Sequence, residues 1–369
     1  MPTSSPRLPV LSTQLVGSWC KPQWLADHDL VYGPEGSWWR IPPEQRDEAF
    51  DDAVRLAVYD QERAGLSLVT DGEQRRQTFS GHFYAFGGID SVHQGAVTNF
   101  GNDIGEYLTM KKRAVTSDDE GKPKVPPKFE QPRVVAPLTW KGPLLADALA
   151  FTRSVTDRPV KVTLIGPASL ALRLVDEHYG DLGDLARGIA DVLNQEIRSL
   201  VAAGAAVIQL DEPEVHFRHS AVEPFAAEVI DRALHGVEAR TTVHMCYGYA
   251  RNIAEKRETP VYDRALELLA STVTDAISLE YEQPGHGPGL LERAGAKDVV
   301  LGVLNLATDA PVETVEHIAG RARDAAAVVG PERLSLAPDC GMWFLPRATA
   351  LAKITAMEQA ARVLRDEFA

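Results

Sequence analysis

Short runs of β-branched and other apolar residues alternate along the chain with longer segments in which apolar residues recur every three or four positions. The short runs are typical of buried parallel strands, and the longer segments of helices that cover a sheet. Eight segments are predicted as strands: Gln14–Ser18, Leu66–Asp71, Val160–Ile165, Ala206–Leu210, Thr241–Met245, Ala276–Glu280, Val299–Val303 and Leu334–Ala337. The helical pattern is clearest over Asp184–Ala203, Val312–Val329 and Arg347–Phe368.

Eight strands that alternate with helices predict the α/β class and a single (β/α)8 TIM barrel over residues 1–369. A doubly wound open sheet is the alternative, but no glycine-rich phosphate loop follows the first predicted strand. The chain has 369 residues and is 44% hydrophobic, so it can bury one large core without a second domain.

One connection is too long for an ordinary βα loop, because roughly ninety residues separate the second predicted strand from the third. We predict an insertion at about 77–158. Its charged and proline-rich stretch Lys111–Arg133 is expected to cross the surface as an extended arm or hairpin. This stretch is either a solvated loop or a lid or homo-oligomer contact. A second long loop, Tyr32–Ile41, carries Trp38 and Trp39, which pack on substrate or on the barrel rim.

The negative net charge of the chain makes some classes of binding partner unfavourable. The formal net charge is −14 and the sequence pI is near 5.2, so the surface disfavours nucleic acid and acidic lipid. No apolar run approaches the roughly 18 residues that span a bilayer, and the first residues lack the apolar core of a signal peptide. We therefore expect a cytoplasmic protein that acts on small molecules and binds neither membranes nor nucleic acid.

The three cysteines, Cys20, Cys246 and Cys340, are too few to form a disulfide framework, so metal binding, reactivity or burial must explain them. His244 and Cys246 are two positions apart on a predicted strand, so their side chains point the same way. Alone, this pair is a weak signal, since a packed cysteine beside a hydrogen-bonded histidine gives the same pattern. Cys20 is best explained as a loop cysteine.

Two more ligand types fall at strand ends: Glu280 ends the sixth predicted strand and Cys340 follows the eighth. Active sites of (β/α)8 barrels lie at the carboxyl ends of the strands, so His244, Cys246, Glu280 and Cys340 are expected to converge there. One imidazole, one carboxylate and two thiolates suit a tetrahedral zinc ion. An incoming thiol that displaces Glu280 or joins the ligand shell would be held as a thiolate, and this thiolate would be the nucleophile.

A second group of candidates is acidic. Glu73 ends the second predicted strand, and Asp211 and Glu212 end the fourth. Glu73 and Asp211 are expected to bind the ammonium group of an amino-acid substrate. Glu212 either binds substrate or caps a helix. Weaker signals are the backbone amides after Gly17 and Gly166 and three candidate acid–base or surface histidines, His216, His219 and His286.

Several of these segments resemble a known family when they are taken in order. VGSW, DGEQRR, LIGPAS, QLDEP, VHMCYG, ISLE, LGVL and APDCG resemble the catalytic half of cobalamin-independent methionine synthase over essentially the whole chain. The resemblance implies zinc on His244, Cys246, Glu280 and Cys340. It also implies substrate contacts from Ser18, Glu73 and Asp211. In length the chain is similar to the short, core-type enzymes of this family.

Two positions depart from the long enzymes of that family. Arg173 stands where a tryptophan stacks on folate, and Ala307 stands where an acid–base histidine lies. The zinc barrel also resembles that of epoxyalkane:coenzyme M transferases. The expected function is zinc-dependent alkyl transfer to a thiol, foremost methyl transfer from a methylated pterin or corrinoid to homocysteine, giving methionine. The alternatives are opening of an epoxide by another thiol and, outside enzymes, a non-catalytic zinc- or thiol-binding protein.

Overall fold

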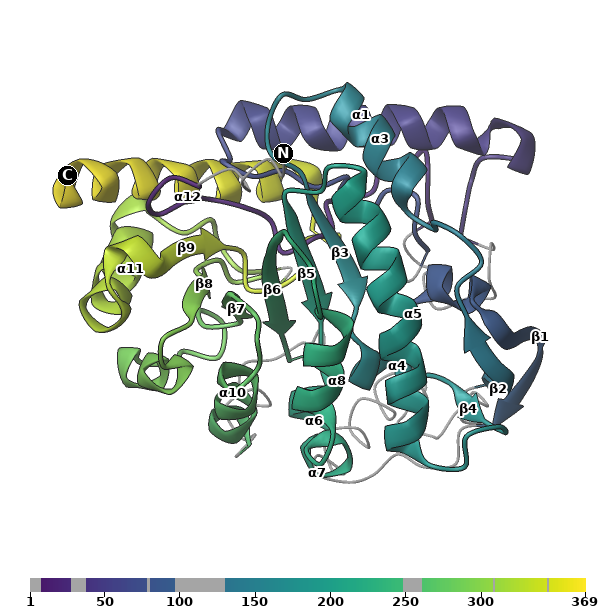
Figure 1. Ribbon diagram of the computed structural model, residues 1–369. Helices are drawn as coiled ribbons and strands as arrows, with labels where there is room; N and C mark the ends of the chain where they lie inside the picture. Colours follow the sequence, from purple (N-terminus) through teal and green to yellow (C-terminus); the bar gives the residue numbers. More distant parts are fainter. Residues whose placement is uncertain are drawn as a thin grey trace, which may run out of the picture.

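A parallel sheet forms the centre of the structure (Figure 1). The computed structural model describes residues 8–27, 38–77, 80–96, 130–247, 261–307, 309–343 and 345–369. The sheet holds six strands in the order β3 (Lys161–Ile165), β5 (Val207–Asp211), β6 (Arg240–Met245), β7 (Ala276–Leu279), β8 (Asp298–Gly302) and β9 (Leu334–Ala337). These strands confirm the α/β class and six of the eight strand predictions.

The other two predicted strands, Gln14–Ser18 and Leu66–Asp71, were wrong as strands. The chain there makes isolated parallel bridges, Thr13 with Leu336 at the β9 edge and Val69 with Val160 at the β3 edge. Side chains occupy backbone groups that a strand ladder would use. The Gln61 amide bonds both the N–H and the C=O of Thr70 at 2.9 Å.

A smaller sheet is built from the predicted insertion and a segment that follows β3. Strands β1 (Gly87–Ala96) and β2 (Glu130–Thr139) pair antiparallel, and β4 (Val175–Asp176) adds parallel to β2. Arg133 of β2 forms ion pairs with Asp90 of β1 at 2.9 Å and with Glu177, which follows β4, at 2.8 Å. In Figure 1 this sheet stands apart from the central one. Most of Lys111–Arg133 lies outside the described residues, as does Tyr32–Ile41 up to residue 37.

Helices cover the central sheet between its strands. The α-helices are α1 (Arg46–Ala64), α3 (Ala146–Ser154), α4 (Pro167–Ala171), α5 (Leu182–Ala202), α6 (Glu214–Phe217), α7 (His219–Val222), α8 (Ala226–Ala233), α10 (Tyr262–Ala270), α11 (Val315–Val329) and α12 (Arg347–Phe368). Short 3-10 helices are η2 (Pro43–Gln45), η3 (Gly81–Ala85), η4 (Pro288–Ala294) and η5 (Pro331–Arg333). The three predicted helices correspond to α5, α11 and α12, with ends that differ by at most three residues.

Local sequence explains α5 well. The Asp181 carboxylate accepts the Asp184 amide at 3.1 Å, which caps the first turn. Leu185, Ile189 and Leu193 recur every four positions and are all buried. No helix within the described ranges is both long and apolar enough to cross a membrane.

The two faces of the central sheet are buried differently. Ile277 and Leu279 of β7 join the large core beneath the helices, whereas Ala276 belongs to a small cluster with Val300 and Ala337. Because side chains alternate along a strand, this second face is the one that also carries polar residues toward the strand ends. The functional side chains described below lie on that face.

Aromatic residues of the predicted Trp38–Trp39 loop pack on the protein itself. Trp38 is buried, and its ring lies 5.1 Å from Trp39 and 5.7 Å from Trp343 between centroids. Lys21 Nζ lies 5.5 Å from the Trp38 ring centroid. Trp38 thus packs against Trp39 and Trp343, and packing of these aromatics on substrate stays a prediction.

Candidate metal and substrate site

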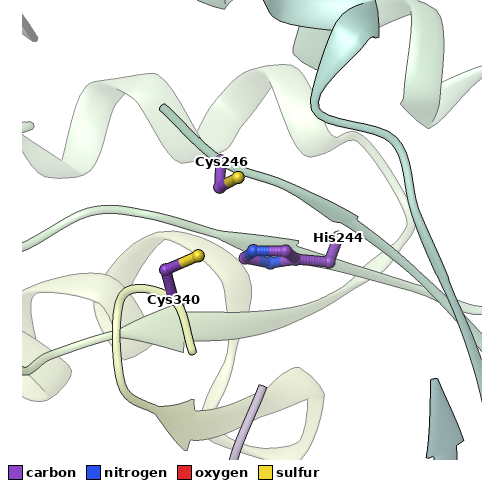
Figure 2. A group of neighbouring side chains, drawn as sticks. All are labelled: His244, Cys246 and Cys340. Carbon is purple, nitrogen blue, oxygen red and sulfur yellow. The ribbon is translucent and has the colours of Figure 1, made fainter. Parts of the chain in front are cut away.

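Three metal-ligating side chains meet at the carboxyl ends of two strands (Figure 2). His244 lies on β6, Cys246 follows this strand, and Cys340 follows β9. One nitrogen and two sulfur atoms from these residues all lie within 4.8 Å of one another. Ligand atoms around a tetrahedral zinc ion, each about 2.0–2.3 Å from it, are about 3.3–3.8 Å apart, so small adjustments would let all three share one ion.

The His244 ring is oriented by its neighbour on β7. Its Nδ1 contacts Ser278 Oγ at 3.0 Å, and the two residues are paired in register. Its Nε2 is buried and has no hydrogen-bond partner among the described residues. Metal-binding histidines commonly use the second ring nitrogen in this way, and a buried nitrogen without a partner is costly. Nε2 is therefore the atom suited to bind a metal.

The electrostatics of the cysteines also fit a cation. A hydrogen bond with Cys246, burial, and the negative charges of Cys246 and Glu280 raise the pKa of the Cys340 thiol well above its usual range. A cation among these groups reverses that effect, because a coordinating thiol is deprotonated outright. Two sulfur atoms and one imidazole suit zinc better than magnesium or calcium.

Glu280, the fourth predicted ligand, lies beside this group but is not one of the mutually close atoms. It is fully buried, and its Oε1 accepts the amide N–H of Tyr247 at 3.0 Å. Its charge acts on both His244 and Cys340. The structure thus brings three of the four predicted ligands together, and ligation by Glu280 stays a prediction.

Asp339 connects the segment after β9 to the segment after β7. Its Oδ1 accepts the amides of Tyr281 and Glu282 at 3.2 and 3.0 Å, and its Oδ2 accepts the amide of Gln283 at 2.6 Å. These bonds fix the chain next to Glu280 relative to Cys340. Sequence reasoning missed this residue, although an acidic residue directly before a candidate ligand was a signal.

The Glu73 carboxylate sits against the segment that precedes Ser18. Glu73 has a positive φ of 55°, and its amide donates to Asp71 Oδ1 at 2.9 Å. Its Oε1 accepts the Thr163 hydroxyl at 2.8 Å. A methyl group on Gly17 would lie 2.4 Å from the same oxygen, so only glycine leaves room for this carboxylate.

Asp211, which together with Glu73 is called the acidic pair below, adjoins the metal ligands. It pairs in register with His244 on the neighbouring strand, and its Oδ1 accepts the Gln209 side-chain amide at 2.7 Å. Burial raises the pKa of Asp211 to about 7, and the charges of Glu73 and Cys246 act in the same direction. Asp211 is thus within electrostatic reach of Glu73 and of the ligand group.

Ser18 lies beside the segment that carries Cys340. Its C=O accepts the amide of Met342 at 3.1 Å, while its buried Oγ has no partner among the described residues. Gly17, which precedes Ser18, lies against Glu73, and Asp211 pairs with His244, so these polar residues come from segments that border the ligand group. Such an arrangement suits a ligand with a thiol at one end and an ammonium group at the other.

A family model described as "Cobalamin-independent synthase, Catalytic domain" matches residues 11–363, nearly the whole chain. The chain belongs to the cobalamin-independent methionine synthase family. Family membership makes it a methyltransferase, and the resemblance of its motifs is confirmed.

Other members of the family are similar along their full length. A methionine synthase of Saccharolobus solfataricus is 30% identical over 365 residues, which cover 98% of this chain and 97% of the relative. One of Sulfurisphaera tokodaii is 28% identical over 362 residues, which cover 98% and 94%. A solved B12-independent methionine synthase from Shewanella sp. W3-18-1, in complex with selenomethionine, has a TM-score of 0.82 at 30% identity, covering 98% and 99%.

In this member of the methionine synthase family, Glu212 caps a helix. Its two carboxylate oxygens accept the amides of Ala168 at 3.0 Å and Ser169 at 2.8 Å, at the start of α4. Burial raises its pKa to about 7. Glu212 thus occupies the amides that follow Gly166, which sequence reasoning had left open to a ligand. Substrate binding by Glu212 stays a prediction.

The three candidate acid–base or surface histidines are held by aromatic and backbone groups. The His216 ring lies 4.5 Å from Tyr247 and 5.2 Å from Tyr262 between centroids, and burial lowers its pKa to about 3. His286 Nε2 contacts Tyr247 Oη at 2.9 Å. His219 Nδ1 contacts the Val215 carbonyl at 3.0 Å. His216 and His219 are buried, so the surface location that was predicted for such histidines was wrong for these two.

The remaining candidates lie outside the ligand group. Cys20 Sγ contacts the Met342 carbonyl at 3.2 Å, and burial raises its pKa to about 12, as suits a packed loop cysteine. Arg173 donates to Glu214 Oε1 at 3.3 Å. The amide of Ala307 donates to Asn305 Oδ1 at 2.9 Å.

Proposed function

We propose that this protein is a zinc-dependent methionine synthase, which transfers a methyl group to the sulfur of homocysteine without a cobalamin of its own. The observation that carries the proposal is the adjacency of His244, Cys246 and Cys340 next to an acidic pair. Its relative from Shewanella was solved with selenomethionine, an analogue of the expected product. We further propose that the six-stranded sheet and its two bridged edges form one closed (β/α)8 barrel.

Each group has a distinct task in this reaction. Nε2 of His244 and the sulfur atoms of Cys246 and Cys340 would hold zinc, with Glu280 as a fourth ligand that yields to substrate. When bound, zinc would supply a Lewis acid that lowers the pKa of the incoming thiol. The new bond forms between the homocysteine sulfur and the methyl carbon, and the bond from that carbon to its donor breaks, so the donor leaves with the electron pair.

Recognition of the amino acid falls to the carboxylates. Glu73 and Asp211 would accept hydrogen bonds from the substrate ammonium, and Ser18 would bond its carboxylate. Holding the amino-acid end at these residues and the thiol end at the metal ligands would fix the sulfur in line with the methyl group, which lowers the entropic part of the activation barrier. We propose a methylated pterin or a methylated corrinoid as the donor.

The test combines metal spectroscopy with product analysis. X-ray absorption of the zinc-loaded protein should show two sulfur neighbours, rising to three when homocysteine is added. Labelled homocysteine should become methionine with one of the two donor classes, and Asp211→Asn should reduce kcat/KM for homocysteine. An unchanged sulfur shell, or no methionine with either donor, would refute the proposal. Alkylation of another thiol by an epoxide would favour the alternative reaction.

A further inference from the structure

A lysine that no role above uses is buried on the same face of the sheet as Asp211. Lys161, at the start of β3, is 1% exposed. Its Nζ donates to Gln14 Oε1 at 2.9 Å, to Gln209 Oε1 at 2.8 Å and to the Leu15 carbonyl. Three acceptors match the three N–H bonds of an ammonium group.

This ammonium group determines how the neighbouring amide is oriented. A lysine side chain has no acceptor, so Gln209 must turn its oxygen toward Lys161 and its NH₂ away. That NH₂ donates to Asp211 Oδ1 at 2.7 Å. Gln209 is fully buried, so bulk water does not compete for either contact.

We propose that Lys161 and Gln209 are positioning residues, which hold the Asp211 carboxylate in the orientation that binds the ammonium group of an amino-acid thiol. The inference rests on the proposed function, because it assigns a determinant of substrate selectivity at the same site. Burial lowers the pKa of Lys161 to about 7, while the charges of Asp211 and Glu73 act in the opposite direction. The lysine and both recognition carboxylates are thus electrostatically coupled.

Removal of the ammonium group should free the Gln209 amide to rotate. Its oxygen would then be a buried acceptor without a donor, so the amide would no longer be fixed from both sides, and the Asp211 carboxylate that it holds would be free to turn from its position. The ammonium of the substrate would lose one charge-assisted hydrogen bond. The thiol and carboxylate ends of the substrate would keep their contacts, so the loss should be selective.

The experiment compares two thiols that differ by one amino group, homocysteine and 4-mercaptobutanoate, by calorimetric titration of the zinc-loaded protein. Wild type should prefer homocysteine. Lys161→Met should reduce this preference about 10-fold or more, the effect of one charge-assisted hydrogen bond. Its affinity for 4-mercaptobutanoate should change less than about two-fold. Lys353→Met is the matched control, because Lys353 is equally buried but bonds the Pro311 carbonyl and Glu313 instead of Gln209.

The outcomes separate the two proposals. A Lys161→Met protein that folds and keeps the wild-type preference overturns the positioning role alone. A wild type without any preference for homocysteine overturns the proposed function and the inference together. Gln209→Met removes the amide that connects Lys161 to Asp211 and should lose the preference for homocysteine equally. It therefore provides the test if Lys161→Met fails to fold. A preference retained in Gln209→Met also overturns the inference.

Discussion

The substitution Gly17→Ala adds one methyl group next to the Glu73 carboxylate, and its effect on substrate binding follows from the distances around it. The added methyl would lie 2.4 Å from Glu73 Oε1 and 3.0 Å from Thr163 Cγ2. An ordinary contact is about 3.4 Å or longer, so the carboxylate must move by about 1 Å. The Thr163 hydroxyl, now 2.8 Å from that oxygen, would lose its hydrogen bond.

The expected cost is one charge-assisted hydrogen bond to the substrate ammonium, about 1.5–3 kcal/mol, or about 10- to 150-fold in kcat/KM for homocysteine. Steady-state kinetics measures it, and zinc content should remain stoichiometric. Gly320→Ala is the control, since a methyl there meets nothing within 4 Å. A folded Gly17→Ala enzyme whose kcat/KM for homocysteine stays within two-fold of wild type would refute the role of Glu73.

Three further predictions concern the metal ligand, a buried acid and the amino-terminal segment. Ser278→Ala should weaken zinc binding about 10- to 100-fold in chelator competition, because Ser278 orients His244. Because the pKa of Glu212 is raised in the folded state, its contribution to the free energy of unfolding is fully present below the unfolded pKa of about 4.5. This contribution is lost as the pH rises through about 7. Urea unfolding of wild type against Glu212→Gln should therefore show the wild-type advantage shrinking by roughly 1.4 kcal/mol per pH unit in that window. Thr13→Val should cost about 1.5–3 kcal/mol in urea unfolding, because the Thr13 hydroxyl donates to buried Glu358 at 2.6 Å.

Each of these has a contradicting result. Zinc affinity of Ser278→Ala equal to wild type would mean that packing alone orients the histidine. A difference between wild type and Glu212→Gln that grows with pH would show that the carboxylate is ionised more easily in the folded state than in the unfolded one. An unchanged urea midpoint for Thr13→Val would show that water replaces the lost hydroxyl.

Most of the fold was predictable because it depends on local patterns. The six strands and the helices α5, α11 and α12 follow directly from apolar periodicity. The two segments Gln14–Ser18 and Leu66–Asp71 have the same periodicity, yet side chains such as Gln61 take up their backbone groups. Apolar periodicity contains no signal for such competition between side chains and the backbone.

The candidate site was predictable in part for the same reason. The rule that parallel strands end at one edge brought His244, Cys246 and Cys340 together correctly, although Cys340 lies 94 positions after Cys246. The rule does not give the direction of a carboxylate. It therefore left open whether Glu212 binds substrate or caps a helix, and the structure shows it bonded to the amides at the start of α4.

By itself, the sequence determined which residue types end each strand and on which face they project, since a strand alternates strictly and a parallel sheet aligns its ends. The tertiary structure alone decided which donor meets which acceptor. The bonds from Lys161 through Gln209 to Asp211 join residues 48 and two positions apart. Hydrogen bonds reach only about 3 Å, so such contacts depend on packing that no spacing rule encodes.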